Sequence, residues 1–211
     1  YGAHICSEFT GDYGREPEKI DYYNYFKPQL DVFCFSEKLN ERNVIDLIGF
    51  ETVPNFYEVK GILSWGPDKI NKPFYISLSV GDDGKLRDGT DLAEICTLLR
   101  QLIADKKINP NFTMLGVNCV SFKQSLGMVE NLNNNLQGLD VPLIVYPNSG
   151  EEYDSEKKIW LTKDNEDSAN ISWETLVPQF VKNNCRIIGG CCRTTPADIA
   201  KIRKATDQCF A

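Results

Sequence analysis

Five apolar runs alternate with five amphipathic segments along most of the chain, and this alternation limits the fold more than any other feature. The runs expected to form strands are Asp46–Thr52, Pro73–Val80, Phe112–Cys119, Pro142–Gly150 and Arg186–Cys192. The segments expected to form helices are Pro54–Trp65, Thr90–Lys106, Lys123–Leu136, Trp173–Asn183 and Pro196–Cys209. Such alternation is typical of a parallel sheet covered by helices, either an open doubly wound sheet or a (β/α)8 barrel. Phosphate-loop and dinucleotide fingerprints are missing after every run, which disfavours a nucleotide-binding open sheet.

Composition limits the classes of partner that the chain is expected to bind. The chain has 211 residues, 42% of them hydrophobic and 25% charged, which fits one core of ordinary size. Its net charge of -7 argues against a nucleic-acid-binding surface, which would need a basic stripe. No apolar run approaches the roughly 18 residues of a membrane span, so no membrane partner is expected. The absence of a targeting signal predicts a cytoplasmic location.

The carboxyl ends of the expected strands gather side chains that can carry chemistry, because those ends meet at one edge of a parallel sheet. The residues at this edge are Glu51, Thr52, Asn118, Cys119, Tyr146, Asn148, Ser149, Cys191 and Cys192. The other five of the eight cysteines fall in loops or helix-like stretches and are expected to be packing thiols.

Three cysteines from two strands suggest a metal site. Thiolates suit zinc, and a site with three protein ligands leaves a fourth position for a substrate thiol. Gly189 and Gly190 would let the two successive cysteines turn toward one ion. The residues alone leave three alternatives open: a redox pair of Cys191 and Cys192, a structural site that includes His4, and coincidence.

Five short motifs in the chain resemble those of a known protein family. In chain order they are "SEFTGDYG" (Ser7–Gly14), "GFETVPN" (Gly49–Asn55), "GVNC" (Gly116–Cys119), "YPNSGE" (Tyr146–Glu151) and "GGCCRT" (Gly189–Thr194). Together they resemble the homocysteine S-methyltransferase family, and its fungal members in particular. The resemblance implies a zinc-dependent (β/α)8 barrel that methylates homocysteine to methionine, with S-methylmethionine or S-adenosylmethionine as the methyl donor.

The resemblance also implies roles for individual residues. Cys119, Cys191 and Cys192 would be the zinc ligands, and they would activate the homocysteine thiol in the fourth position. Glu51 would bind the substrate ammonium group through a charge-assisted hydrogen bond.

Neighbouring residues are expected to support this site. Asn118, Tyr146 and Asn148 are expected to bind or orient the substrate, and Phe9, Tyr13 and Tyr146 are candidates for cation–π contact with the sulfonium donor.

Relative to the family, the chain is expected to be one homocysteine-binding barrel domain over residues 1–211 that carries the last five of eight strand–helix units, with the first three strands absent. Two rival functions therefore remain: a truncated, noncatalytic zinc-binding derivative of the enzyme, and a redox dithiol protein. The oligomeric state is left open.

Overall fold

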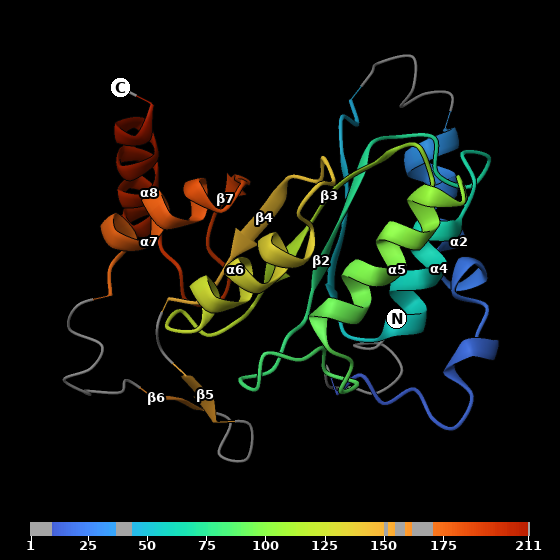
Figure 1. Cartoon of the computed structure of the whole chain (residues 1–211), viewed down its shortest axis with the longest axis horizontal. Helices are drawn as coiled ribbons and strands as arrows, with labels where there is room; N and C mark the ends of the chain where they lie inside the picture. The colour runs from blue at the N-terminus through green and yellow to red at the C-terminus, as the bar shows by residue number, and fades with distance from the viewer. Residues whose placement is uncertain (1–9, 37–43, 150–151, 155–158, 162–170, 211) are drawn as a thin grey trace.

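Five parallel strands form the main sheet of the protein. A computed structural model describes residues 10–36, 44–149, 152–154, 159–161 and 171–210. The strands lie in the order β1-β2-β3-β4-β7, and every neighbouring pair is parallel (Figure 1). Their bounds are Ile48–Val53, Phe74–Leu78, Phe112–Asn118, Leu143–Tyr146 and Cys185–Ile188. The parallel sheet expected from the apolar runs is confirmed, with strands somewhat shorter than the runs.

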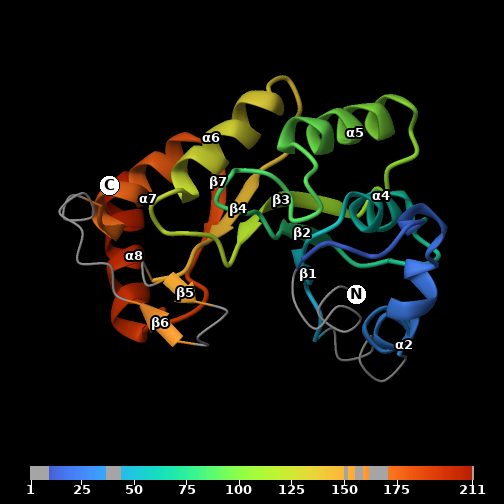
Figure 2. The same cartoon turned by 90° about the horizontal axis from the view of Figure 1, so that it is seen from below.

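Helices follow the strands. They are α4 (Phe56–Ser64), α5 (Leu92–Ala104), α6 (Ser125–Asn135), α7 (Trp173–Lys182) and α8 (Pro196–Cys209). The first four cover one face of the sheet, and α8 packs against α7. Figure 2 shows α4, α5, α6 and α7 following the curve of the sheet on one side. Helix α2 (Tyr22–Phe35), preceded by the short 3-10 helix η1 (Pro17–Lys19), lies against α4. None of the helices in the described ranges is long and apolar enough to cross a membrane.

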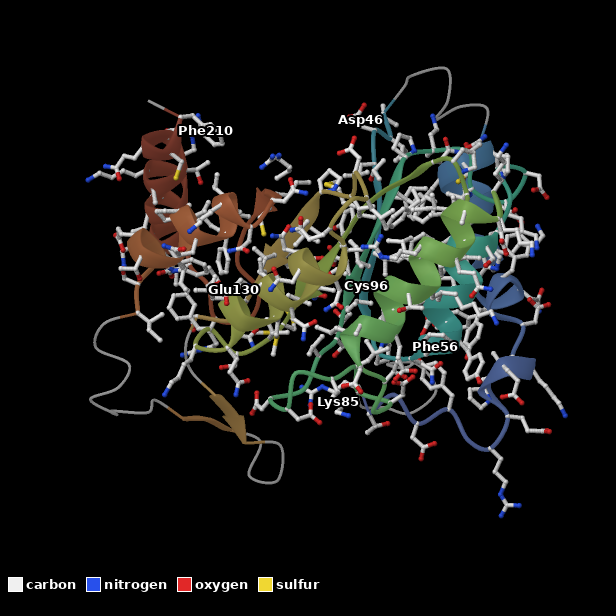
Figure 3. All side chains as sticks on the ribbon, viewed as in Figure 1. Asp46, Phe56, Lys85, Cys96, Glu130 and Phe210 are labelled. Atoms are coloured by element: carbon white, nitrogen blue, oxygen red, sulfur yellow. A yellow bond between two sulfur atoms is a disulfide. The ribbon has the colours of Figure 1, made fainter. Side chains whose placement is uncertain are left out.

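The core lies between the sheet and these helices. On β2, Phe74, Ile76 and Leu78 are fully buried, and on the helices so are Ile62 and Leu99. Three cysteines expected to be packing thiols, Cys34, Cys96 and Cys185, are buried and free (Cys96 is labelled in Figure 3). Burial raises the pKa of the Cys96 thiol to about 11, so it stays protonated and chemically quiet. Cys6 lies outside the described residues.

The opposite face of the sheet presents the alternate set of side chains. Strand register aligns Gly49 with Tyr75, and Tyr75 with Met114. Two residues further along β2, toward the carboxyl edge of the sheet, Ser77 aligns with Gly116. A Cβ atom on Gly116 would come 1.7 Å from the Ile144 carbonyl oxygen, so only glycine permits this approach of β3 to β4.

The structure also contains elements that the sequence did not predict. Besides α2, these are the short antiparallel strands β5 (Glu152–Asp154) and β6 (Ile159–Leu161), which lie between β4 and α7 in the sequence. At α8 a helix cap is present: the Thr195 side chain accepts a hydrogen bond from the Asp198 N–H, and Pro196 is the first helical residue.

Candidate active site

Cys119, Cys191 and Cys192 lie together at the carboxyl edge of the sheet. Cys119 directly follows β3, and the other two follow β7 after the glycine pair. Backbone hydrogen bonds fix both loops on the end of β4 and the residue that follows it: the Cys119 N–H donates to the Tyr146 carbonyl (3.2 Å), and the Cys191 N–H donates to the Pro147 carbonyl (2.8 Å). The end of β4 therefore sets the distance between the two cysteine loops.

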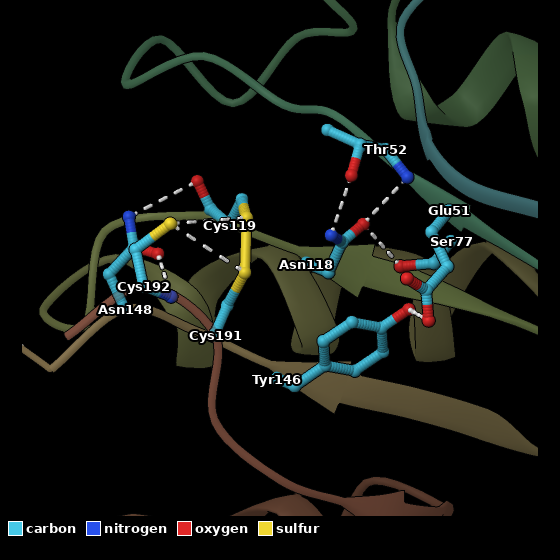
Figure 4. The surroundings of a disulfide bond; sticks show 9 residues. All are labelled: Glu51, Thr52, Ser77, Asn118, Cys119, Tyr146, Asn148, Cys191 and Cys192. Atoms are coloured by element: carbon cyan, nitrogen blue, oxygen red, sulfur yellow. Dashed lines mark hydrogen bonds between the residues drawn. A yellow bond between two sulfur atoms is a disulfide. The ribbon is translucent and has the colours of Figure 1, made fainter. Parts of the chain in front are cut away.

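The three sulfur atoms lie within 4.8 Å of one another, and Figure 4 shows the three side chains pointing toward one another. Cys119 and Cys191 are joined as a disulfide. The Cys192 Sγ atom lies 3.9 Å from that of Cys119 and 4.0 Å from that of Cys191. The sequence could not tell which sulfurs would pair, and the redox alternative had assumed a bond between Cys191 and Cys192.

This donor set fits a zinc ion once the disulfide is reduced. Two sulfurs bound tetrahedrally to zinc at about 2.3 Å lie about 3.8 Å apart. The two non-bonded sulfur distances, 3.9 and 4.0 Å, agree with that spacing. Three thiolates and an open fourth position suit a catalytic rather than a closed structural site.

Asn148 links the two cysteine loops. Its Oδ1 atom accepts a hydrogen bond from the Cys192 N–H at 3.1 Å, and its Nδ2 donates to the Cys119 carbonyl at 3.4 Å. The adjacent Ser149 N–H donates to the Cys192 carbonyl at 3.1 Å. The Asn148 side chain thus bridges the two cysteine loops (Figure 4), while its expected contact with substrate stays a prediction.

Asn118 ties three strands together beside the cysteines. Its Oδ1 accepts hydrogen bonds from the Thr52 N–H (2.9 Å) and the Ser77 hydroxyl (2.7 Å), and its Nδ2 donates to Thr52 Oγ1 (2.8 Å). The side chain is buried, with 2% exposure. These contacts define a structural tie, and the predicted substrate contact of Asn118 stays a prediction.

Two residues next to this tie have left-handed backbone conformations. Thr52 has a φ of 58° and Cys119 a φ of 52°. A positive φ is costly for a residue with a Cβ, above all for a β-branched one, and it persists where surrounding contacts hold it. At Thr52 the Asn118 side chain provides those contacts, since it bonds both the N–H and the hydroxyl.

Glu51 stands at the open face, one residue before Thr52. Its Oε1 atom accepts hydrogen bonds from two phenols, that of Tyr75 at 2.7 Å and that of Tyr146 at 3.1 Å. Burial, and next the Glu51 hydrogen bond, raise the pKa of Tyr75, and burial above all raises the pKa of Tyr146. Both phenols therefore remain protonated donors at neutral pH.

Sequence reasoning had named Tyr146 but missed Tyr75. The available signal was strand register: Tyr75 alternates with Ser77 on β2, the strand next to the one that carries Glu51. A tyrosine within a strand is common in any sheet, so the residue type alone did not distinguish it.

Tyr13, one of the residues considered for the sulfonium, lies away from the cysteine cluster. The Tyr13 hydroxyl donates to Glu58 on α4 at 2.5 Å, and burial raises the pKa of the Glu58 carboxyl. Tyr13 thus contacts a buried carboxylate on a helix that covers the far face of the sheet. Phe9 lies outside the described residues.

Fold and site together define an α/β protein whose parallel sheet carries a cluster of three cysteines and a hydrogen-bonded carboxylate at its carboxyl edge. Comparison with known proteins agrees: the family model described as homocysteine S-methyltransferase matches residues 1–206. The chain therefore belongs to the homocysteine S-methyltransferase family.

Individual relatives support the same assignment. Homocysteine S-methyltransferase 2 of Saccharomyces cerevisiae is 55% identical over 208 residues, which are 99% of this chain and 60% of the relative. Homocysteine S-methyltransferase of Escherichia coli is 32% identical over 96% of this chain and 59% of its own length. The crystal structure of the metallated form of the Escherichia coli homocysteine methyltransferase MmuM matches with a TM-score of 0.66 and 28% identity, over 97% of this chain and 58% of that one. The chain thus spans about 60% of the length of the curated relatives it matches.

Proposed function

We propose that the protein transfers a methyl group from a sulfonium donor, S-methylmethionine or S-adenosylmethionine, to the sulfur of homocysteine and so forms methionine. The observation that carries this proposal is the convergence of three cysteine sulfurs within 4.8 Å, in a chain of this family. We further propose that the sheet forms the last five units of a (β/α)8 barrel. Its unbroken parallel order, with helices along one face, supports that architecture.

Cys119, Cys191 and Cys192 would hold zinc as thiolates. Zinc at this place would supply the positive charge that keeps a substrate thiol ionised at neutral pH. Asn148 would keep the two cysteine loops at a fixed separation, because its amide bonds the backbone of both. Partners of this kind orient the ligands of a metal site.

The methyl-transfer step takes place between the homocysteine sulfur and the sulfonium donor. The thiol proton of homocysteine leaves to solvent, and its sulfur attacks the donor methyl group in line. A new sulfur–carbon bond forms while the bond from the methyl to the sulfonium sulfur breaks, and that electron pair leaves the donor as a neutral thioether. The negative charge of the homocysteine thiolate and the positive charge of the sulfonium cancel in this step, so a site that excludes water favours it.

Glu51 would bind the other end of homocysteine. Its carboxylate stands on the open face of the sheet and can accept a charge-assisted hydrogen bond from the substrate ammonium group. The substrate would then be held by its thiol at the cysteines and by its amino group at β1.

The test is zinc content and methyl transfer by the reduced chain, with each sulfonium supplied separately. We expect one zinc ion per chain and methionine formation with at least one donor. Cys119→Ser should lower zinc affinity by about 10-fold or more and abolish transfer, since second-sphere changes alone already cost 10- to 100-fold. Cys209→Ser, which changes a free cysteine on α8, is the matched control and should alter neither.

Other outcomes identify the rival functions. Stoichiometric zinc without turnover would mark a noncatalytic zinc-binding derivative. A chain that binds no zinc when reduced, but reversibly forms the Cys119–Cys191 bond, would be a redox thiol protein, and the proposed function would be wrong.

A further inference from the structure

We propose that Tyr75 is a positioning residue that, with Tyr146, fixes the Glu51 carboxylate so that the site selects thiols bearing an ammonium group. This inference rests on the proposed function and assigns a role to a residue outside the cysteine cluster.

Both phenols bind the same carboxylate oxygen. Tyr75 reaches Glu51 Oε1 from the neighbouring strand β2, and Tyr146 reaches it from β4, across β3 and β2. Within the described part of the chain, no hydrogen bond is made to the second oxygen, Oε2. The first oxygen is therefore held from two directions, and the second is available to a ligand.

The surroundings of Glu51 favour a cationic ligand. No lysine or arginine of the described ranges forms an ion pair with it. The two phenols donate hydrogen bonds but carry no charge. They therefore orient the carboxylate without neutralising it, and a cationic ligand can pair with it. A carboxylate held on one oxygen loses less rotamer freedom when a ligand binds, and this preorganisation increases affinity.

Gly49 makes room for the Tyr75 ring. The register places Gly49 beside Tyr75, and a Cβ atom at Gly49 would come 2.5 Å from the phenol oxygen and 2.6 Å from the ring carbon that carries it. A side chain at position 49 would therefore push the end of the Tyr75 ring away from Glu51. Gly49→Ala and Tyr75→Phe thus remove the same hydrogen bond by independent routes.

The experiment compares two ligands on the reduced, zinc-loaded chain. One is homocysteine, and the other is 4-sulfanylbutanoate, the same thiol acid without its amino group. We expect Tyr75→Phe to weaken homocysteine binding about 3- to 10-fold, the effect of one hydrogen bond, while 4-sulfanylbutanoate binding changes less than about 2-fold. Gly49→Ala should act in the same direction. Tyr57→Phe, which removes a phenol from α4, is the control and should change neither dissociation constant.

Several results would overturn the inference. Equal weakening of both ligands would mean that Tyr75 acts on the fold rather than on ammonium recognition, and unchanged homocysteine binding would mean that it does not position Glu51. Turnover gives a further readout: a positioning role raises KM for homocysteine and leaves kcat nearly unchanged. A wild-type chain that binds neither thiol would contradict the proposed function instead. Crystal structures would then still decide the inference, since a Glu51 carboxylate unmoved in Tyr75→Phe would refute it.

Discussion

At the scale of single residues, Asn118 joins the two halves of the candidate site. Its own chain neighbour is Cys119, and its side chain bonds Thr52, the neighbour of Glu51. Both Thr52 and Cys119 have left-handed backbones; Thr52 lies where the register of β1 against β2 shifts, and Cys119 directly follows β3. Such strain is retained where the surrounding contacts outweigh it.

Asn118→Ala is therefore expected to lower the free energy of unfolding by about 1–3 kcal/mol, because it leaves the half-buried Thr52 N–H and the buried Ser77 hydroxyl without their acceptor. In a Thr52→Gly background the loss should be smaller by at least about 0.5 kcal/mol, since glycine adopts a positive φ without steric cost. A double-mutant cycle by urea unfolding under reducing conditions measures this coupling. Strictly additive losses would contradict it, and Asn131→Ala on α6 serves as an exposed control.

The sequence identified part of the site at this scale. The three cysteines and Glu51 could be placed because they end apolar runs, and parallel strands gather their ends at one edge. The left-handed Thr52 could not be foreseen, since threonine favours the extended region and only a contact from another strand reverses that preference. For the same reason Asn118 was expected to contact substrate, whereas its visible partners are Thr52 and Ser77.

At the scale of elements, the beginning of α8 anchors the segment that follows the cysteine pair. The Asp198 carboxylate accepts hydrogen bonds from the Thr195 N–H (3.0 Å) and hydroxyl (2.7 Å), and from the Trp173 ring N–H of α7 (3.3 Å). One side chain thus closes the helix cap and joins α8 to α7.

The hydrogen bonds from Thr195 lower the pKa of Asp198, which gives the cap a pH dependence. The carboxylate stabilises the fold above its unfolded pKa of about 3.9, and this contribution is lost as pH falls through the lower folded pKa. We expect Asp198→Asn to cost about 1 kcal/mol at pH 7 and progressively less below about pH 4. Thermal unfolding against pH tests this, with Asp207→Asn near the other end of α8 as control. A difference that stays constant at acid pH would refute it.

Element type was easier to predict than element ends. The helices α5 and α8 matched their expected ranges within a few residues, because each begins with a recognisable cap. The strand after Pro142 was expected to reach Gly150 but ends at Tyr146, where the backbone turns to bond the two cysteine loops. That turn depends on partners far along the chain, which no local pattern encodes.

At the scale of the whole molecule, the sheet has two edges in the described residues, β1 and β7. An edge strand presents unpaired backbone groups and can pair with another chain. On β7 the Ile187 side chain is 38% exposed, which adds an apolar contact to that edge.

The chain is accordingly expected to self-associate as its concentration rises, and Ile187→Lys should reduce this, because a lysine on an edge strand opposes pairing. Ile199→Lys is the matched control: Ile199 is 46% exposed but lies on α8, away from any strand edge. Sedimentation velocity over a range of concentrations would measure the effect. If both variants reduce self-association equally, net charge explains the effect. If neither variant changes self-association, the β7 edge is not the contact.

Gly116 has a consequence beyond the packing of two strands. Its missing side chain lets β3 approach the Ile144 carbonyl, and Asn118 lies two residues further along the same strand. Natural selection on the proposed site would therefore also act on Gly116, which is neither a proposed zinc ligand nor the proposed ammonium-binding residue. A variant allele at codon 116 would separate β3 from β4, and the resulting loss of the proposed function would come from this change in the strands rather than from a change at Cys119 or Glu51.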